Sequence, residues 1–355
     1  MLALIAGALL QMQDKGLNMP PVDFPGWPTS EARADWPGER HLTNVHQLTF
    51  GGQNAEAYWN LDSTKLSYQT SQTWWPDEQI MSMNGDGTDK RLVSTGVGRC
   101  TCSYYSPDGN WIYFSSTHAK EQGPQPKLDF SKGYVWMINP NYSMYRRPVG
   151  GGPLQTIVGK PGYVAETTLA PNGKYMVFTT SWNGNINIYR SDLNGHHIEP
   201  LVTTEGYNGG PFISWDSKWI VYRRTDFEKP GDAAEFHALL KQNLVRPLKM
   251  EIWIMDSHGG NKRQVTNLGC ASFAPFMHPN GKQIIFSSNY GDPKGREFDL
   301  FLINTDGTGL ERVTKAPEFD GFPMFTRDGK RLVFCSNRYN TTPGETNIFV
   351  ADWKE

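Results

Sequence analysis

Apolar and polar side chains alternate over short stretches along most of this chain. The stretch SPDGNWIYFSS, which begins at Ser106, shows the pattern: a polar turn comes first and an alternating run follows. Asp or Asn followed by Gly or Ser supplies the positive φ values that tight hairpin turns require. Alternation with a period of two is typical of a strand with one buried face. The stretch therefore predicts a hairpin turn and the strand that leaves it.

This unit recurs along the chain. The other copies are NLDSTKLSYQTS from Asn60, APNGKYMVFTTS from Ala170, SWDSKWIVYRRT from Ser214, HPNGKQIIFSSN from His278 and TRDGKRLVFCSN from Thr326. A second alternating stretch follows each copy: EQIMSMNGDG at Glu78, YVWMINPN at Tyr134, NIYRSDLNG at Asn187, EIWIMDSHGG at Glu251, DLFLINTDG at Asp299 and NIFVADW at Asn347. With a short strand on either side, each unit has four strands in about 45 residues, the period of a propeller blade. The sequence predicts an all-β, six-bladed β-propeller of four-stranded antiparallel blades.

The two ends of the repeat array complement each other. The last unit stops at Glu355 without room for a fourth strand, whereas ERHLTNVHQLT, residues 39–49, looks like an unpaired strand before the first unit. Pairing the two would remove the exposed sheet edges of an open array. We therefore expect a single domain over residues 39–355, closed into a ring by an N-terminal strand.

Composition and charge fit this picture and narrow the partners. The 355 residues are rich in Gly, Pro, Trp and Tyr, as short strands and tight turns require. A formal net charge of −2 gives no basic field for nucleic acid. Residues 2–10 are apolar but far shorter than the ~20 residues of a membrane span. We interpret residues 1–38 as an export-signal remnant or an extended arm, and expect no transmembrane segment.

The repeats resemble those of the TolB β-propeller family. SPDG before an alternating strand, then segments of the D-I-Y and M-N-x-D-G type and a closing L-T, recur at regular spacing over about residues 39–355. The resemblance implies WD40-like PD40 repeats and a periplasmic or secreted protein, with a cytoplasmic one as the alternative. No segment matches the N-terminal domain of TolB, so the partners of TolB are not carried over.

Two long links identify the functional face of the expected ring. They are residues 118–133 and 226–249, and AAEFHALLKQNLV in the second predicts a short helix between Gly231 and Pro247. Both join the second strand of a blade to its third, so both lie on the face where the inner strands begin. Long insertions in a compact repeat are usually functional or disordered. We expect a lid or wall over the channel mouth, with a merely tolerated insertion as the alternative.

The same face gathers candidate ligand-binding residues. They are Glu56, His118, Glu166, Asn208, Arg223, Arg224, Asn289, Arg296, Asp320 and Arg338, with Cys100, Cys102 and Ser272 nearby. Arg binds planar anions bidentately, so the mixture suits a carboxylate, phosphate or sugar. The alternative is that these groups satisfy each other around a water-filled channel.

Three motifs have both a functional and a plain reading. Cys100 and Cys102 are spaced to point to one side of a strand, as a metal or redox pair or, in the favoured reading, as small gap-filling residues. NGDGTDK and NTDGTGLE resemble calcium loops but lack the full acidic spacing, which favours hairpins. In GDPKGREFD, the side chains of Asp292, Arg296, Glu297 and Asp299 form an internal ion-pair network or hold a polar ligand.

These observations favour a non-catalytic propeller that binds a protein, peptide or glycan at the channel mouth. The alternative is a polysaccharide lyase or hydrolase-type enzyme acting on a polar polymer, since oligogalacturonate lyase resembles the same repeat family; its test residues are His118, His237, Arg224 and Glu166. A third hypothesis is an accessory to a separate hydrolase. We assign no catalytic residue, expect a monomer without a resident cofactor, and keep a divalent metal in the channel as the one cofactor to test.

Overall fold

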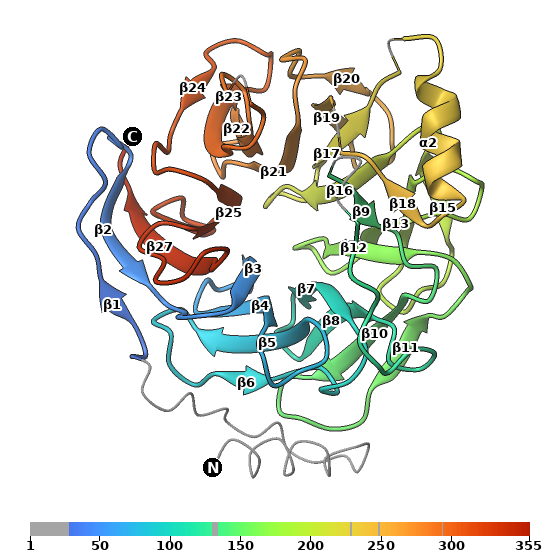
Figure 1. Ribbon diagram of the computed structural model, residues 1–355, viewed down its shortest axis with the longest axis horizontal. Helices are drawn as coiled ribbons and strands as arrows, with labels where there is room; N and C mark the ends of the chain where they lie inside the picture. The colour runs from blue at the N-terminus through green and yellow to red at the C-terminus, as the bar shows by residue number, and fades with distance from the viewer. Residues whose placement is uncertain (1–27, 130–133, 228, 248, 293) are drawn as a thin grey trace.

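The computed structural model describes residues 28–129, 134–227, 229–247, 249–292 and 294–355. Six antiparallel sheets stand around a central axis, which confirms the all-β, six-bladed propeller expected from the repeats (Figure 1). The apolar stretch read as an export signal, residues 2–10, lies outside the described residues. Within them, no helix has the length and hydropathy needed to cross a membrane.

Each of the first three blades contains four strands that run outward from the axis. The first blade contains β3 (Gln53–Trp59), β4 (Lys65–Ser71), β5 (Gln79–Asn84) and β6 (Arg91–Leu92). The second contains β7 (Cys100–Tyr105), β8 (Trp111–Ser116), β10 (Ser143–Pro148) and β11 (Gln155–Val158). The third contains β12 (Val164–Leu169), β13 (Met176–Thr180), β14 (Asn187–Ser191) and β15 (Glu199–Val202).

The remaining blades follow the same order. The fourth contains β16 (Asn208–Ile213), β17 (Trp219–Thr225), β19 (Met250–Asp256) and β20 (Arg263–Gln264). The fifth contains β21 (Ser272–Met277), β22 (Gln283–Ser288), β23 (Asp299–Asn304) and β24 (Glu311–Arg312). The sixth contains β25 (Asp320–Phe325), β26 (Arg331–Ser336), β27 (Asn347–Trp353) and β2 (Leu42–Gln47), with β1 (Glu31–Ala32) at its outer edge.

The repeated turn works through its serine or threonine and its aspartate. In the second blade the Ser106 hydroxyl donates to Asp108 at 2.5 Å and accepts the backbone N–H of Trp111 at 2.9 Å. Gly109 follows with a φ of +71°, a value that costs glycine little. The same hydroxyl-to-carboxylate bond recurs between Thr326 and Asp328 at 2.6 Å. The hairpin read from the sequence is therefore fixed by side-chain bonds as well as by backbone conformation.

One strand differs from the sequence expectation. YVWMINPN was read as the third strand of the second blade, but that place is taken by β10, which lies further along the chain. Residues Trp136–Met137 instead form β9, which pairs with β18 (Leu244–Val245) of the other insertion. Pro140, which cannot donate to a sheet ladder, comes directly after this stretch. The first insertion therefore extends well past residue 133.

The helix expected in the second insertion is present but shorter. It is α2 (Asp232–Leu240), and the end of the predicted stretch forms β18 instead. Phe236 is its buried side chain and packs against Phe227, with ring centroids 5.6 Å apart. In Figure 1, α2, β9 and β18 lie together on one side of the ring. The two insertions, far apart in sequence, thus form one structure.

The sixth sheet contains strands from both ends of the described chain. β2 pairs antiparallel with β27, and Leu42 lies opposite Trp353. Figure 1 shows this as the blue strand lying beside the red one. The ring of the His41 side chain stacks on Trp353 with centroids 4.6 Å apart, and its Nδ1 lies 2.6 Å from the carbonyl oxygen of Lys354. Backbone pairing and side-chain contacts together hold the N-terminal strand in this blade.

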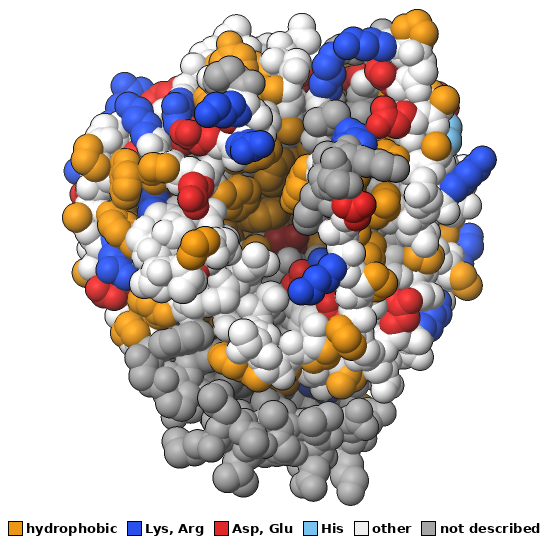
Figure 2. Space-filling view, in the orientation of Figure 1, with side chains coloured by type: hydrophobic (Ala, Val, Ile, Leu, Met, Phe, Trp, Pro, Cys, Tyr) orange, Lys and Arg blue, Asp and Glu red, His pale blue; other side chains and the backbone are white. Residues whose placement is uncertain are grey.

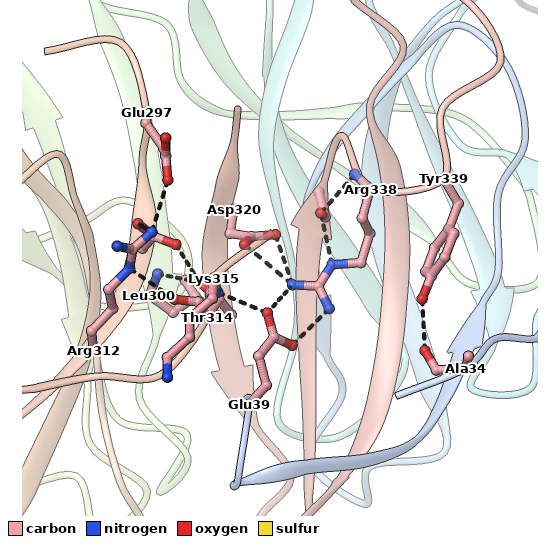
Figure 3. Close-up of polar contacts among 12 residues, drawn as sticks. Ala34, Glu39, Glu297, Leu300, Arg312, Thr314, Lys315, Asp320, Arg338 and Tyr339 are labelled. Atoms are coloured by element: carbon pink, nitrogen blue, oxygen red, sulfur yellow. Dashed lines mark hydrogen bonds and ion pairs between the residues drawn. The ribbon is translucent and has the colours of Figure 1, made fainter. Parts of the chain in front are cut away.

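A buried ion triad adds a second tie between the N-terminal segment and the sixth blade. The Arg338 guanidinium lies between the carboxylates of Glu39 and Asp320, with closest distances of 2.9 Å and 3.1 Å (Figure 3). All three side chains are fully buried. Glu39 also accepts the backbone N–H of Lys315 at 2.8 Å. Removing one member of such a group leaves the other charges buried and uncompensated, which is strongly destabilising.

We predict that Arg338→Met lowers the free energy of unfolding by about 3–5 kcal/mol, because two carboxylates then stay buried without a cation. Chemical denaturation followed by tryptophan fluorescence measures the change. The matched control is Arg327→Met, which removes an exposed guanidinium and should change stability by less than about 0.5 kcal/mol. Adding Glu39→Gln and Asp320→Asn to Arg338→Met should recover part of the loss. Equal stability of the two single variants would contradict a role for the triad.

Candidate functional site

Every innermost strand contains the same irregularity near its start. Its register with the second strand shifts, as between Ala55 and Tyr58 in the first blade, and a residue inside the shift has a positive φ. The six residues are Glu56, Cys102, Glu166, Gly210, Ala274 and Phe322, with φ values from +49° to +57°. Such bulges re-aim side chains and are frequent beside functional sites. All six residues line one narrow space of about 40 Å³ around the axis, which we call the channel.

The channel wall is divided chemically. The first three blades contribute Glu56, Cys102 and Glu166, whereas the fifth and sixth contribute Ala274 and Phe322. The fourth blade contributes Gly210, where any side chain would collide with the guanidinium of Arg223. Glycine at this position therefore serves both the left-handed backbone and the space that the arginine occupies.

Glu166 is the better satisfied of the two channel carboxylates. Arg223 donates to it in an ion pair, the Tyr207 hydroxyl donates at 2.8 Å and the backbone N–H of Gly210 donates at 2.9 Å. Burial opposes its ionisation, but the Arg223 charge and these hydrogen bonds hold its pKa below the ordinary value. Glu166 is thus a fixed, compensated anion.

Glu56 lies in the same channel without a counter-ion of its own. Burial raises the pKa of its carboxyl from near 4.5 to about 7; a hydrogen bond with the Cys102 thiol lowers it, and the charge of Glu166 raises it further. By surface area the residue is only half-buried, so it stays open to the channel. Near neutral pH this carboxyl exchanges between its two protonation states.

A larger cavity opens above the channel on the face that carries the insertions. Its volume is about 770 Å³, within the usual range for ligand pockets. Rings of Trp136, Phe273, Phe298 and Phe319 line it, and successive ring centroids lie 5.9, 5.3 and 6.2 Å apart. Figure 2 shows this hollow at the centre of the face, with hydrophobic side chains on its walls and acidic ones at its deepest point. The cavity is chiefly apolar.

The two insertions build one side of this cavity. Trp136 comes from the first, whereas Phe236, Leu239 and Pro247 come from the second. The Trp136 ring also lies over the Arg223 guanidinium, 5.3 Å from its central carbon, and edge-on to Tyr207 at 6.2 Å. The insertions therefore form a wall of the cavity, and Trp136 connects that wall to the channel.

Charged side chains surround the apolar part of the cavity. Asp226 pairs with Arg224 at 2.8 Å, and Glu235 pairs with Arg246 at 3.0 Å. Arg296, at the opposite side, is exposed, and within the described parts of the chain no carboxylate forms an ion pair with it. An apolar interior with a charged rim is the usual composition of a recognition site.

The candidate residues named from the sequence fall into three groups. Glu56, Glu166 and Arg223 meet in the channel, and Asn289 and Arg296 line the cavity. The others are bonded within the blades: Asn208 donates to the Thr204 carbonyl at 2.9 Å, His118 lies 2.9 Å from the Ser116 hydroxyl, Arg224 pairs with Asp226, and Asp320 pairs with Arg338. His237, named for the enzyme alternative, lies 2.8 Å from Glu205 on an exposed part of α2. The structure thus does not gather His118, His237, Arg224 and Glu166 into one site.

The two cysteines expected to share one side of a strand do not share one environment. Cys100 is buried with Ile112 and Phe114 between blades, as a gap-filling residue would be. Cys102 lines the channel, because the bulge in β7 gives it a φ of +55°. The prediction from strand periodicity was wrong here, since a bulge interrupts the alternation. All four cysteines are free thiols.

The charged stretch at residues 291–299 divides between both of its expected roles. Arg312 pairs with Glu297 at 2.8 Å and with Asp299 at 2.6 Å, which is an internal network. Burial raises the pKa of the Asp299 carboxyl to about 7, although Arg312 opposes the shift. Arg296 instead lines the cavity.

Sequence reasoning missed the aromatic floor of the cavity. Phe273, Phe298 and Phe319 stand at the starts of inner strands or in the links before them, where the sequence pattern was read only as strand continuation. Recurrence of Phe at that place in the last two blades is a signal that could have identified them. Among the described residues, no group of three or more His, Cys, Asp or Glu side chains is arranged to hold a metal ion.

Comparisons with known proteins agree with this architecture. No family model matches the chain. An uncharacterised protein of Agrobacterium fabrum is 23% identical over 256 residues, which are 68% of this chain and 74% of that protein. A TolB homologue of Chlorobium luteolum is 23% identical over 180 residues, or 51% of this chain and 34% of the relative. The chain thus matches only about a third of that TolB homologue.

Solved structures give the same result for the fold. A protein described as TolB from Agrobacterium tumefaciens superposes with a TM-score of 0.56 at 18% identity, over 86% of this chain and 91% of that one. TolB from Acinetobacter baumannii gives 0.54 at 17% identity, over 75% and 55% of the two chains. An oligogalacturonate lyase in complex with manganese gives 0.51 at 13% identity, over 97% and 99%. The chain has a TolB-like six-bladed propeller fold.

The raised pKa of Glu56 predicts a pH-dependent difference between the wild-type protein and Glu56→Gln. Between about pH 4.5 and 7 the folded protein holds a proton that the unfolded chain releases, so this carboxyl lowers stability as pH rises. The variant lacks that effect. Its unfolding free energy relative to wild type should therefore rise from pH 4.5 to 8, by up to about 3 kcal/mol.

Urea denaturation of both proteins at several pH values measures this difference, and the other raised carboxyls, such as Asp299, cancel because both proteins contain them. Glu318→Gln, at an exposed carboxylate, serves as the control and should show no such trend. A difference between Glu56→Gln and wild type that stays constant with pH would show that Glu56 ionises normally.

Proposed function

We propose that this protein is a non-catalytic binding propeller that takes an apolar segment of a peptide or partner protein into the cavity on its insertion-bearing face. The observation that carries this proposal is the aromatic cavity of about 770 Å³, placed over the channel mouth and walled by both insertions. Sites of this kind, with an apolar interior and a few polar groups, are the default ligand sites of folded proteins.

The chemistry of the cavity favours a peptide over a glycan. Its rings pack edge to face against each other, as Phe273 does on Trp136 and Phe298, and so present apolar edges and faces together. Acidic oligosaccharides need charge-assisted hydrogen bonds along their length, whereas of the candidate arginines only Arg296 lines the cavity. One or two large apolar side chains fit the space better.

Exposed aromatic side chains beside the cavity extend the proposed contact surface. Tyr134, in the cavity wall, is 61% exposed, and Tyr290, next to the cavity residue Asn289, is 46% exposed. Tyrosine is enriched among the residues that dominate interface energetics. We infer that a partner chain reaches across these two residues while its anchor enters the cavity.

We further propose a periplasmic or secreted monomer, supported by the likeness in fold to TolB structures. A cytoplasmic protein is the alternative, and fractionation of the native host distinguishes the two. The lyase alternative has no observation of its own beyond shared fold.

We predict that panning a phage-displayed library of 12-residue peptides on the full chain yields binders rich in aromatic and aliphatic residues. Trp136→Ala should weaken the selected peptides at least about tenfold, as expected for a central aromatic anchor. Isothermal titration measures the affinities. Trp215→Ala is the matched control, since Trp215 belongs to a hairpin turn at the end of an inner strand, on the opposite face.

Chemical blocking of the cavity gives a test that does not depend on folding of a tryptophan variant. Cys270 lines the cavity and is half-buried, so coupling it to pyrene maleimide should abolish peptide binding. Cys270→Ala should bind peptides and resist the block. Binders unaffected by the label, or formation of unsaturated products from oligogalacturonate by wild-type protein, would overturn the proposed function.

A further inference from the structure

We propose that the channel beneath the cavity is a subsite for an organic cation, the ammonium or guanidinium group of a Lys or Arg on the bound peptide, with the Glu56 carboxylate as its counter-ion. This inference rests on the proposed function, because the cavity would hold the apolar part of the same peptide. It adds a charge requirement that the aromatic cavity alone does not impose.

The argument begins with the bulges of the inner strands. They turn six side-chain positions toward the axis, and only Glu56 and Glu166 among those six carry carboxylates. Glu166 already has Arg223, the Tyr207 hydroxyl and a backbone N–H. Glu56 has the Cys102 thiol as its hydrogen-bond partner and no ion pair within the described residues. One of two channel anions is therefore compensated by the protein and the other is open to a ligand.

Desolvation gives the free-energy reason for a cation at this place. A carboxylate removed from water and left without a partner is destabilised, and burial already raises its pKa toward 7. A positively charged group of a ligand would replace the lost hydration and add a charge-assisted hydrogen bond. The free protein thus retains a cost that binding can remove.

The remaining wall of the channel suits an organic cation. Tyr58, Phe212 and Phe322 line the same space as Glu56, and the rings of Tyr58 and Phe212 lie 4.9 Å apart. Aromatic faces attract ammonium and guanidinium groups. A divalent metal such as calcium takes six to eight oxygen ligands, whereas the only channel carboxylate without an ion pair is Glu56. An organic cation needs one anion and apolar surroundings, and both are present.

The size of the channel limits which part of a ligand can enter. A volume of about 40 Å³ holds roughly three water-sized groups. That is enough for the tip of a lysine or arginine side chain and too little for a whole residue. Phe273 lines the cavity and Ala274, the next residue, lines the channel. A side chain anchored in the cavity would therefore need only to extend downward.

Several ionisable groups act on Glu56 and must be kept in view for its pH dependence. They come from neighbouring elements and are Cys102 of β7, Glu166 of β12, Arg223 of β17, Glu78 before β5 and Cys335 of β26. The thiols have pKa values raised by burial, and Arg223 stays charged. Between pH 5.5 and 8, Glu56 is the member of this set expected to change its charge.

The test titrates the full chain with n-butylammonium chloride and, as the uncharged control, with n-butanol, using saturation-transfer NMR. At pH 8 we expect wild-type protein to bind butylammonium about tenfold more tightly than butanol. If only the ionised carboxyl binds and its pKa is about 7, affinity should fall roughly 30-fold at pH 5.5. Glu56→Gln should bind both probes equally and lose the pH dependence, whereas Cys102→Ala, which keeps the carboxyl, should behave like wild type.

Each contrary outcome has a defined meaning. Equal butylammonium binding by wild type and Glu56→Gln, or no binding by either, would overturn the subsite. Displacement of butylammonium by calcium chloride at lower concentration than by potassium chloride would indicate a metal site and also overturn it. The peptide selection separates the two proposals: peptides blocked by the Cys270 label but indifferent to Lys→norleucine replacement would keep the cavity and refute the cation subsite.

Discussion

Antiparallel pairing of β2 with β27 is the interaction on which the rest of the ring depends. Without it, the sixth blade would end at β27 and expose a row of unpaired backbone groups. The pairing is reinforced by a fully buried triad in which Arg338 neutralises Glu39 and Asp320. Since every blade packs only on its neighbours, the positions of both the channel and the cavity follow from keeping six blades in a closed circle.

Local backbone geometry then decides which side chains face the axis. A left-handed residue in each inner strand interrupts the alternation and turns one side chain inward. The blades are alike in this backbone feature and differ in the residue that occupies it. Chemical specificity in this propeller therefore comes from six positions and from the insertions above them, while the blades supply a scaffold of constant shape.

The sequence predicted the fold well because hairpin turns and strand alternation are local signals. Turns such as 106–109 hold their own side-chain bonds, so their residues are recognisable without tertiary information. The site was predicted only in part. The register shift that separates Cys102 from Cys100, and the pairing of β9 with β18, depend on contacts between distant segments. Arg338 was grouped with channel residues, although a partner from the N-terminal segment buries it.

The unequal filling of the six bulge positions has a consequence for orientation. A channel with sixfold rotational pseudosymmetry could admit a ligand in six equivalent ways. Here Glu56, Cys102 and Glu166 form a continuous polar arc, and Ala274 and Phe322 form an apolar arc on the remaining side. Rotation by one blade would move a polar group of the ligand onto an apolar wall. The ring therefore acts as a keyed socket, in which a bound chain has one azimuth and the direction of its path across the face is set.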